Sequence, residues 1–283
     1  MKAGIASIKK ELSGQFSIQE TDSLIALIFE KLKGYSRTQL LLAGDELLTD
    51  NETDEITKIV SRLKNHEPIQ YILGSTEFYG LEFCCVPDVL IPRPETEELV
   101  DWIIKENGAS NPTIIDMGTG TGCIAISLQK NIPQSTVFAC DISPVCIETA
   151  NRNAQQNSAK ILVVEYDIIA GQPQVEFPEF DVVVSNPPYV RESEKALMEK
   201  NVTDFEPDLA LFVVDENPLI FYESIADFAR KNLKDQGKLY FEINESLGDE
   251  TCNMLTAKGF TNIRLKRDIN GKNRMIGCNF FRS

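Results

Sequence analysis

The sequence predicts an α/β protein in which a small helical domain precedes a mostly parallel sheet wound with helices. Three observations favour this fold. Apolar stripes at helical spacing fill the first 65 or so residues, without an alternating strand pattern. Aromatic and turn-forming residues follow from about residue 76. Short apolar runs then alternate with helical segments up to the end of the 283-residue chain, which is long enough for two domains.

Helical stripes define the first domain, which is expected to span residues 1–75. A first helix has one apolar face, made by Ile5, Ile8 and Leu12. A second helix is expected after Ser17, because Ser17 and Glu20 have capping-box spacing, and it should end at Gly34. Its stripe consists of Leu24, Leu27, Ile28 and Leu32, and a third stripe consists of Ile56, Ile59, Val60 and Leu63. These stripes predict the core of a small helical bundle.

Residues 76–92 predict a β-hairpin connector. Apolar and aromatic residues in this stretch are interrupted by Gly80, Pro87 and Asp88, which are typical of turns. Pro94 then suits the first position of a helix, and the acidic residues after it are favourable near the positive end of that helix. The second domain is therefore expected to cover residues 93–283.

The second domain has seven candidate strands, at residues 113–116, 136–140, 161–165, 181–185, 238–243, 262–266 and 275–281. Ser143 and Pro144 predict the N-cap and first turn of a helix that runs to about residue 157, and a further helix is expected at 218–233. The last two strands leave no room for a helix between them. They are therefore expected to form an antiparallel pair.

Composition limits the classes of function. The chain is 42% hydrophobic and has a net charge of -15, which is typical of a globular protein and disfavours a nucleic acid as a direct partner. Its apolar runs are far shorter than the roughly 20 residues that cross a bilayer, and its N-terminus lacks the apolar region of a secretory signal. No membrane association and a cytoplasmic location are expected.

Cysteine and histidine usage argues against a metal site. The seven cysteines contain no Cys-x-x-Cys spacing, and His66 is the only histidine in the sequence. Most cysteines lie in apolar stretches, where a free thiol acts as a small hydrophobic group. We expect the cysteines to fill the core and His66 to take a surface or hinge position.

A glycine-rich turn follows the first strand of the second domain and leads into a helix expected at 123–130. Glycines let the backbone approach a ligand closely, and the start of a helix offers unpaired N–H groups. The candidate cofactor-binding residues are Asp116, Gly118, Thr119, Gly120, Thr121 and Gly122. Taken alone, such a cluster is equally consistent with a tight strand-to-helix turn.

Two acidic residues at the same predicted sheet edge strengthen the ligand interpretation. Asp141 ends the next strand, where its carboxylate could accept hydrogen bonds from both ribose hydroxyls of an adenosine. Asp167, or its neighbour Ile168, could meet the adenine ring after the third strand. Both aspartates could instead cap helices or lie in solvated loops. We favour ligand binding for Asp141 and leave the two alternatives open for Asp167.

The glycine spacing distinguishes between cofactors. Dinucleotide sites usually show G-x-G-x-x-G, whereas this loop reads G-x-G-x-G after Asp116. The pattern is similar to motif I of the class I methyltransferases, which bind S-adenosylmethionine. The resemblance implies S-adenosylmethionine as the cofactor, and the acidic surroundings suit its sulfonium charge.

The tetrad Asn186, Pro187, Pro188 and Tyr189 ends the fourth candidate strand and is the candidate catalytic site. Two prolines fix φ and remove two backbone donors, so the turn presents free acceptors. The Asn186 side-chain oxygen and the Pro187 carbonyl could hold both hydrogens of a planar NH2 group, with Tyr189 against its flat face. The alternative is a plain Asn-Pro-Pro turn.

With this tetrad the sequence resembles the PrmC/HemK family, the protein-(glutamine-N5) methyltransferases that modify the Gly-Gly-Gln glutamine of peptide-chain release factors. The resemblance extends over nearly the whole chain, at residues 68–74, 78–80, 91–97, 116–122, 186–189 and 206–207. The tetrad alone is shared with adenine methyltransferases, and its combination with residues 93–97 is more specific.

The resemblance implies a Rossmann-like seven-stranded class I methyltransferase domain after an N-terminal helical domain and a β-hairpin. It also implies that residues 1–75 grip the release factor. In the family pattern, Gly118 to Gly122, Asp141, Ile168 and Asn186 lie at the cofactor, and the tetrad lies at the glutamine. A monomer is expected.

Two positions depart from the family pattern. Asn244 stands where glycine is frequent, and we expect its backbone to adopt the same left-handed conformation. Asn217 and Pro218 stand where Asp-Gly is usual, so the loop near Glu216 is not predicted.

Two rival functions use the same motifs. An adenine-N6 methyltransferase of DNA or RNA would use the tetrad on an exocyclic amine, but the acidic charge counts against it. A non-catalytic adenosine-binding module would use the glycine loop and Asp141, but it leaves the tetrad unexplained.

Overall fold

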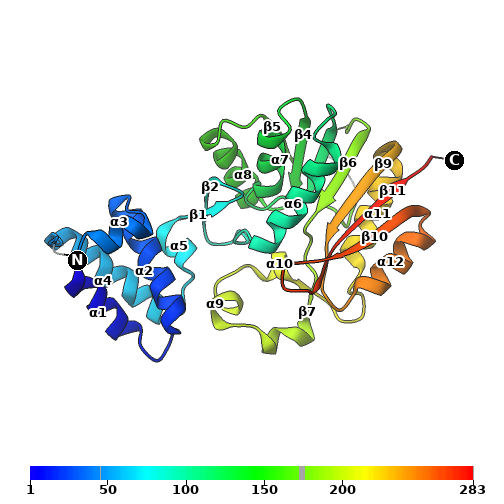
Figure 1. Cartoon of the computed structure of the whole chain (residues 1–283). Coiled ribbons are helices and arrows are strands. Elements are labelled where there is room, and N and C mark those ends of the chain that lie inside the picture. Colours follow the sequence, from blue (N-terminus) through cyan, green and yellow to red (C-terminus); the bar gives the residue numbers. More distant parts are fainter. Residues whose placement is uncertain (45, 172–175, 283) are drawn as a thin grey trace. The chain divides into compact units, whose positions relative to one another are not determined.

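The computed structural model describes residues 1–44, 46–171 and 176–282. The chain divides into two compact units (Figure 1). The first consists of Met1–Gly74 with Glu199–Phe205, and the second consists of Ser75–Met198 with Glu206–Ser283. The assignment of Glu199–Phe205, which contains the short helix α9 (Lys200–Thr203), to the first unit was not foreseen from the sequence.

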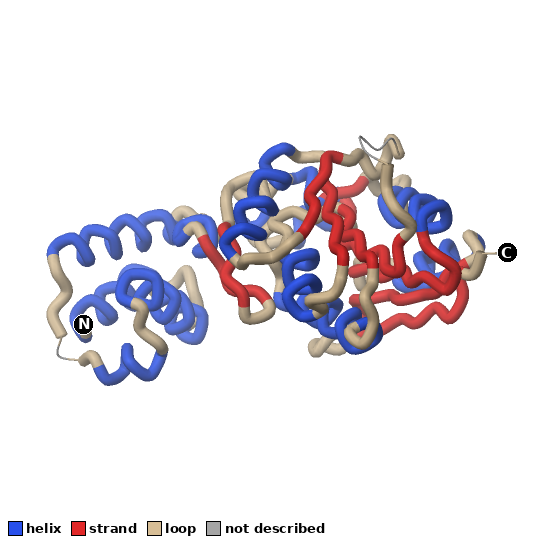
Figure 2. The backbone as a smooth tube through the Cα atoms, turned by 90° about the horizontal axis from the view of Figure 1, so that it is seen from above, coloured by secondary structure: helices blue, strands red, loops and turns tan. Residues whose placement is uncertain are grey.

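The first unit is built of helices (Figure 2). They are α1 (Lys2–Leu12), α2 (Ile18–Lys33), α3 (Arg37–Leu42), α4 (Asp50–Lys64), α5 (Ile69–Leu73) and α9. As predicted, Ser17 caps α2 by accepting a hydrogen bond from the Glu20 N–H, and the helix ends at Gly34, which has a left-handed backbone. His66 lies in a half-buried turn after α4, with a positive φ of 65°.

The predicted apolar stripes form one core, with a single correction. Ile8, Leu12 and the whole α4 stripe are buried together with Leu24 and Ile28. Leu27, however, is exposed, while Ile25 and Phe29 of the same helix are buried. The buried face of α2 therefore includes Ile25 and Phe29 instead of Leu27. This shift arises because α2 contacts α1, α3 and α5.

The hairpin is shorter than the predicted connector and belongs by its contacts to the second unit. Strands β1 (Ser75–Phe78) and β2 (Leu81–Cys84) pair antiparallel around Tyr79 and Gly80. Both turn residues have positive φ, 50° and 72°, as a two-residue hairpin turn of the primed type requires. Residues 85–92 form no strand.

A seven-stranded sheet forms the centre of the second unit, in the order β10-β11-β9-β6-β3-β4-β5. Its strands are β3 (Thr113–Met117), β4 (Thr136–Asp141), β5 (Ile161–Glu165), β6 (Phe180–Ser185), β9 (Leu233–Glu242), β10 (Phe260–Arg267) and β11 (Asn273–Phe280). Strands β9, β6, β3, β4 and β5 are parallel, whereas β11 is antiparallel to both β9 and β10. The predicted fold is therefore confirmed. Strand β9 begins earlier than expected, with a register shift against β6.

Helices cover both faces of this sheet (Figure 1). One face packs against α6 (Pro94–Asn107), α7 (Cys123–Asn131) and α8 (Pro144–Gln156), and the other packs against α11 (Ile220–Asn232) and α12 (Gly248–Ala257). Strand residues alternate between the two cores: Ile114 lies in the first, whereas Ile115 lies in the second. Burial on both faces explains why the central strands read as continuous apolar runs.

The strand order changes direction between β3 and β6, and a ligand site is expected at this position of the sheet. From β3 the chain first builds β4 and β5 on one side, and later β6 and β9 on the other. Open α/β sheets bind ligands beyond the carboxyl ends of the strands at such a point. The short elements η1 (Glu192–Leu197), α10 (Asp208–Leu211), β7 (Val190–Arg191) and β8 (Phe212–Val213) follow β6 in the chain.

Two findings bear on the expectations drawn from composition. In the described ranges, none of the helices combines the length and the apolar character that spanning a bilayer requires. All seven cysteines are free thiols, and six of them are buried. The cysteines thus pack as small apolar groups, as expected.

Candidate active site

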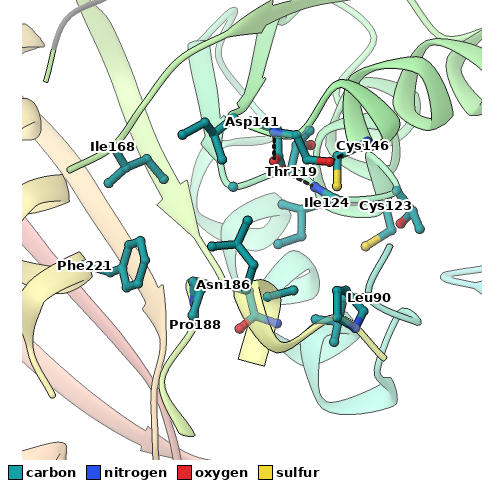
Figure 3. Close-up of a pocket in the computed structure, with 18 of the residues that line it drawn as sticks. Leu90, Thr119, Cys123, Ile124, Asp141, Cys146, Ile168, Asn186, Pro188 and Phe221 are labelled. Atoms are coloured by element: carbon teal, nitrogen blue, oxygen red, sulfur yellow. Dashed lines mark hydrogen bonds between the residues drawn. The ribbon is translucent and has the colours of Figure 1, made fainter. Parts of the chain in front are cut away.

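A cavity of about 280 Å³ opens at the carboxyl edge of the sheet in the second unit. Its lining comes from the segments after β3, β4, β5 and β6, together with residues before and within α6. In Figure 3, Thr119 and Asp141 lie at one end of the lining, and Asn186 and Pro188 lie towards the other. The structure thus brings the glycine loop and the tetrad to one cavity, although the sequence separates them by more than sixty residues.

The glycine loop curves around the cavity through left-handed backbone. Gly118 and Gly120 have φ values of 74° and 55° and line the cavity together with Thr119 and Thr121. The N–H groups of Gly118 and Thr119 both donate to the Cys140 carbonyl at 2.9 Å, which ties the loop to β4. A Cβ atom on Gly118 would come within 3.7 Å of the Ile168 side chain. Side chains at Gly118 or Gly120 would therefore reduce the space in the cavity.

Gly122 is part of the predicted cofactor set but does not line the cavity. Its φ is 80°, and an added Cβ atom would come within 3.1 Å of both Ala150 in α8 and Ile126 in α7. This glycine instead permits the start of α7 to pack closely against α8.

Asp116 also lies outside the lining, buried beneath the loop. Its Oδ2 atom accepts a hydrogen bond of 2.6 Å from the Thr119 hydroxyl, so the carboxyl group holds the loop from below. Burial raises the pKa of Asp116 to about 7, although the Thr119 hydrogen bond opposes the rise.

This raised pKa predicts a pH dependence of stability. The folded protein holds a proton on Asp116 that the unfolded chain releases near its ordinary pKa of about 4. The protonated carboxyl therefore favours the folded state fully below about pH 4, and this contribution is lost as the pH rises through 7. We expect Asp116→Asn to become progressively more stable than the wild type over this range, as measured by urea unfolding without cofactor.

The matched control is Asp54→Asn, which makes the same change on an exposed helix position of the first unit. We expect this control to leave the pH profile of the unfolding free energy unchanged. If the stability difference between Asp116→Asn and the wild type were constant from pH 4 to 8, Asp116 would not be the titrating group.

Asp141, Asp167 and Ile168 all line the cavity. The Asp141 carboxylate accepts hydrogen bonds from Gly120 N at 2.9 Å and from Ser143 N at 3.0 Å, and it remains half-buried at the lining. Burial raises its pKa, although these backbone hydrogen bonds oppose the rise. Asp167 accepts from the N–H groups of Ile169 and Ala170. Both readings of Asp167 therefore stay open, since it shapes its own loop as well as lining the cavity.

Two members of the tetrad, Asn186 and Pro188, line the cavity. Asn186 follows the fully buried end of β6 and donates from its Nδ2 atom to the Thr96 hydroxyl at 3.2 Å. Thr96 in turn donates to Glu242 Oε2 at 2.6 Å. The Asn186 side chain is thus held from behind by residues on α6 and β9.

Pro187 and Tyr189 do not belong to the lining. The Tyr189 hydroxyl donates to Glu242 Oε1 at 3.0 Å, and its ring packs partly buried against the α11 side of the sheet. Burial raises the pKa of Tyr189 well above its ordinary value. The Tyr189 hydroxyl is thus held by Glu242, and the predicted contact between the Tyr189 ring and the face of an acceptor stays a prediction.

Asn244 corrects another expectation. It does not adopt the left-handed conformation that glycine would supply. Its side chain instead donates to the Tyr189 carbonyl at 3.1 Å and to Glu194 at 2.9 Å. Asn244 therefore fixes the end of the tetrad through hydrogen bonds that a glycine cannot make.

Much of the lining could not be found by motif reasoning. The additional lining residues come mainly from four places: the approach to α6, the start of α8, α10 and α11. They include Leu90, Arg93, Thr96, Cys146, Leu209 and Phe221. Arg93 and Thr96 had a signal, since both belong to the distinctive segment 93–97. The apolar residues had none, because an isolated leucine or phenylalanine is ordinarily core.

Metal ligands do not gather at this cavity or elsewhere in the part of the chain that the structure describes: no three histidine, cysteine, aspartate or glutamate residues are grouped in a way that could hold an ion.

Solved structures with the same fold define the class of protein. A methyltransferase of Pyrococcus furiosus has a TM-score of 0.54 at 16% identity, covering 83% of this chain and 100% of that one. A 16S rRNA methyltransferase of Thermus thermophilus, solved with AdoMet and guanosine, has a TM-score of 0.53 at 15% identity, covering 73% and 49%. The fold is that of a class I methyltransferase.

Sequence relatives identify the family within this class. Residues 96–226 match the Methyltransferase small domain family, and residues 6–74 match the PrmC N-terminal domain family. The chain is 46% identical to the release factor glutamine methyltransferase of Flavobacterium psychrophilum, over 95% of both chains. It is 42% identical to that of Bacteroides thetaiotaomicron, over 97% of this chain and 98% of the relative. The protein belongs to the release factor glutamine methyltransferase family.

Proposed function

We propose that the protein transfers a methyl group from S-adenosylmethionine to the side-chain amide nitrogen of the glutamine in the Gly-Gly-Gln motif of peptide-chain release factors. One observation carries the proposal beyond family membership. Asn186, a side chain that can accept a hydrogen bond from an amide NH2 group, lines the same cavity as the glycine loop. The acceptor and the methyl donor would therefore meet inside one cavity.

The lining fits S-adenosylmethionine. The side-chain-free edges of Gly118 and Gly120 leave room for the cofactor chain, and Asp141 offers a carboxylate to the ribose hydroxyls. Ile168 and Phe221 supply apolar surface for the adenine ring. When bound, the cofactor would supply an electrophilic methyl carbon on a sulfonium, and the negative charge of carboxylates in the lining would favour that positive charge. A relative of the same fold has been solved with this cofactor.

The tetrad would hold the amide nitrogen of the substrate. An amide lone pair is delocalised, and acceptors placed on its two hydrogens should restore part of its nucleophilicity. Asn186 Oδ1 supplies the first acceptor. The Pro187 carbonyl, which we predicted as the second, stays a prediction. Pro188 lines the cavity and, by its fixed φ, stiffens the turn next to Asn186.

The helical residues 1–75 are proposed to grip the release factor, with the hairpin at 76–92 as a connector and residues 93–283 as the catalytic domain. The support is the match of residues 6–74 to the PrmC N-terminal domain and the location of the whole cavity lining in the other unit. Release factors act in translation, so the proposed location is the cytoplasm, and the proposed working form is a monomer.

The test is mass spectrometry of a purified release factor after incubation with the enzyme and methyl-labelled cofactor. We expect one labelled methyl group on the glutamine of the Gly-Gly-Gln motif, and none on a release factor in which asparagine replaces that glutamine. A parallel incubation with duplex DNA and RNA addresses the adenine alternative. A label that appears on adenine, or on another release-factor residue, would contradict the proposal.

A further inference from the structure

A chain of hydrogen bonds links Asn186 to the interior of the second unit. Asn186 Nδ2 donates to Thr96 Oγ1 at 3.2 Å, and Thr96 Oγ1 donates to Glu242 Oε2 at 2.6 Å. Tyr189 donates to the other oxygen of Glu242 at 3.0 Å. Thr96 and Glu242 are 2% and 1% exposed, so these contacts are shielded from water. Residues on α6, β9 and the tetrad thus form one connected network.

The direction of these hydrogen bonds is fixed by Glu242. In the structure both hydroxyls donate to it, Thr96 to Oε2 and Tyr189 to Oε1. The 2.6 Å distance from Thr96 lies in the range of a charge-assisted O–H···O⁻ bond. Burial raises the pKa of Glu242, and the hydroxyls of Thr96 and Tyr189 and the charge of Arg274 oppose that rise. Each carboxyl oxygen therefore accepts one hydroxyl hydrogen.

The consequence reaches Asn186. Once the Thr96 hydrogen is committed to Glu242, only a lone pair of Thr96 Oγ1 can face Asn186. A lone pair requires a donor, so the NH2 end of the Asn186 amide must point at Thr96. The Oδ1 end is thereby available to accept a hydrogen from a ligand. If Thr96 could donate to Asn186 instead, the amide could turn over and present two hydrogens to the substrate NH2 group.

We propose that Thr96 and Glu242 are positioning residues that fix which end of the Asn186 amide faces the methyl acceptor. The inference rests on the proposed function of Asn186 and deepens it. It also gives the distinctive segment 93–97 a task in the reaction, because Thr96 of that segment lies in the first turn of α6 directly against the tetrad.

Thr96→Val tests the inference, because valine keeps the shape of threonine and removes only the hydroxyl. We expect kcat to fall on the order of 10- to 100-fold, with KM for the release factor and the affinity for the cofactor changed far less. Thr96→Ser restores the hydroxyl and should recover most of the rate. Glu242→Gln can donate as well as accept, so it should lower kcat similarly, and the double variant should be little worse than either single one.

The matched control is Thr251→Val. Thr251 is fully buried on α12, and its hydroxyl donates to the carbonyl of Leu247, the N-cap residue of that helix. This variant should leave kcat unchanged, which separates the loss of a buried hydroxyl from the loss of orientation. A Thr96→Val enzyme with wild-type kcat, or a Thr96→Ser enzyme as slow as Thr96→Val, would overturn the inference.

A second measurement needs no methyl transfer. The side-chain amide NMR signal of Asn186, assigned by its loss in Asn186→Ala, is expected to move in Thr96→Val and in Glu242→Gln but to keep its position in Thr251→Val. If Thr96→Val leaves the signal in place, the inference fails. If the wild type shows the expected signals but leaves the glutamine of the release factor unmodified, only the proposed function fails.

Discussion

Replacement of Asn186 by alanine is expected to lower the rate of methyl transfer by about 10²- to 10³-fold, the loss typical when one preorganised hydrogen-bonding group is removed from a reacting centre. The substitution removes the side-chain oxygen that is proposed to hold the substrate NH2 group. The glycine loop and Asp141 are untouched. We therefore expect the cofactor dissociation constant to change by less than about tenfold.

Single-turnover methylation of a release factor and calorimetric titration of the cofactor measure the two quantities separately. Asn151→Ala is the control, since Asn151 is exposed on α8 and its Nδ2 atom donates to the Ile147 carbonyl of that helix. An Asn186→Ala enzyme that methylates at the wild-type rate would refute the role assigned to this residue. If lost cofactor affinity explained the whole loss of rate, Asn186 would be a cofactor-binding residue and would not hold the substrate NH2 group.

The fold was predictable because its signals are local. The apolar runs at β3, β4 and β6 end in glycine or proline turns, and Ser143 with Pro144 marks the start of α8, as the structure confirms. The early start of β9 had no such signal. Residues 234–237 contain no apolar run, and the register with β6 shifts across them, from the pair Phe180 and Leu233 to the pair Val182 and Lys238. The exposure of Leu27 was not predictable either. An apolar stripe indicates that one face of a helix is buried, but it does not show which residues lie at the middle of that face.

The site was predictable only in part, for a related reason. A motif states which residues follow one another, but not where each side chain points. Asn186 and Pro188 line the cavity, whereas Tyr189 of the same tetrad is outside the lining and donates its hydroxyl to Glu242. Thr96 and Glu242 are separated by 146 positions, so their contact is a product of the fold. Asn244 shows that a departure from a glycine pattern can add a side-chain function rather than copy a backbone conformation.

Asp141→Ala is expected to weaken cofactor binding. A hydrogen bond to a charged group contributes about 1.5 to 3 kcal/mol, and two ribose hydroxyls could each donate one to this carboxylate. Loss of a single bond would raise the dissociation constant by about 10- to 150-fold. The effect on kcat at saturating cofactor should be smaller, because the acceptor is held by the tetrad.

The same carboxylate also supports the loop, so loop damage must be distinguished from lost ligand contacts. Asp141 accepts from Gly120 N and Ser143 N, and alanine leaves both donors without their partner. Asp141→Asn retains one acceptor oxygen but not the charge, and should bind the cofactor with intermediate affinity. Calorimetry of both variants, with urea unfolding of the cofactor-free proteins, separates the two effects. If Asp141→Ala bound the cofactor with undiminished affinity, this carboxylate would support the loop and would not contact the ribose, because the loss of a ribose hydrogen bond would weaken binding.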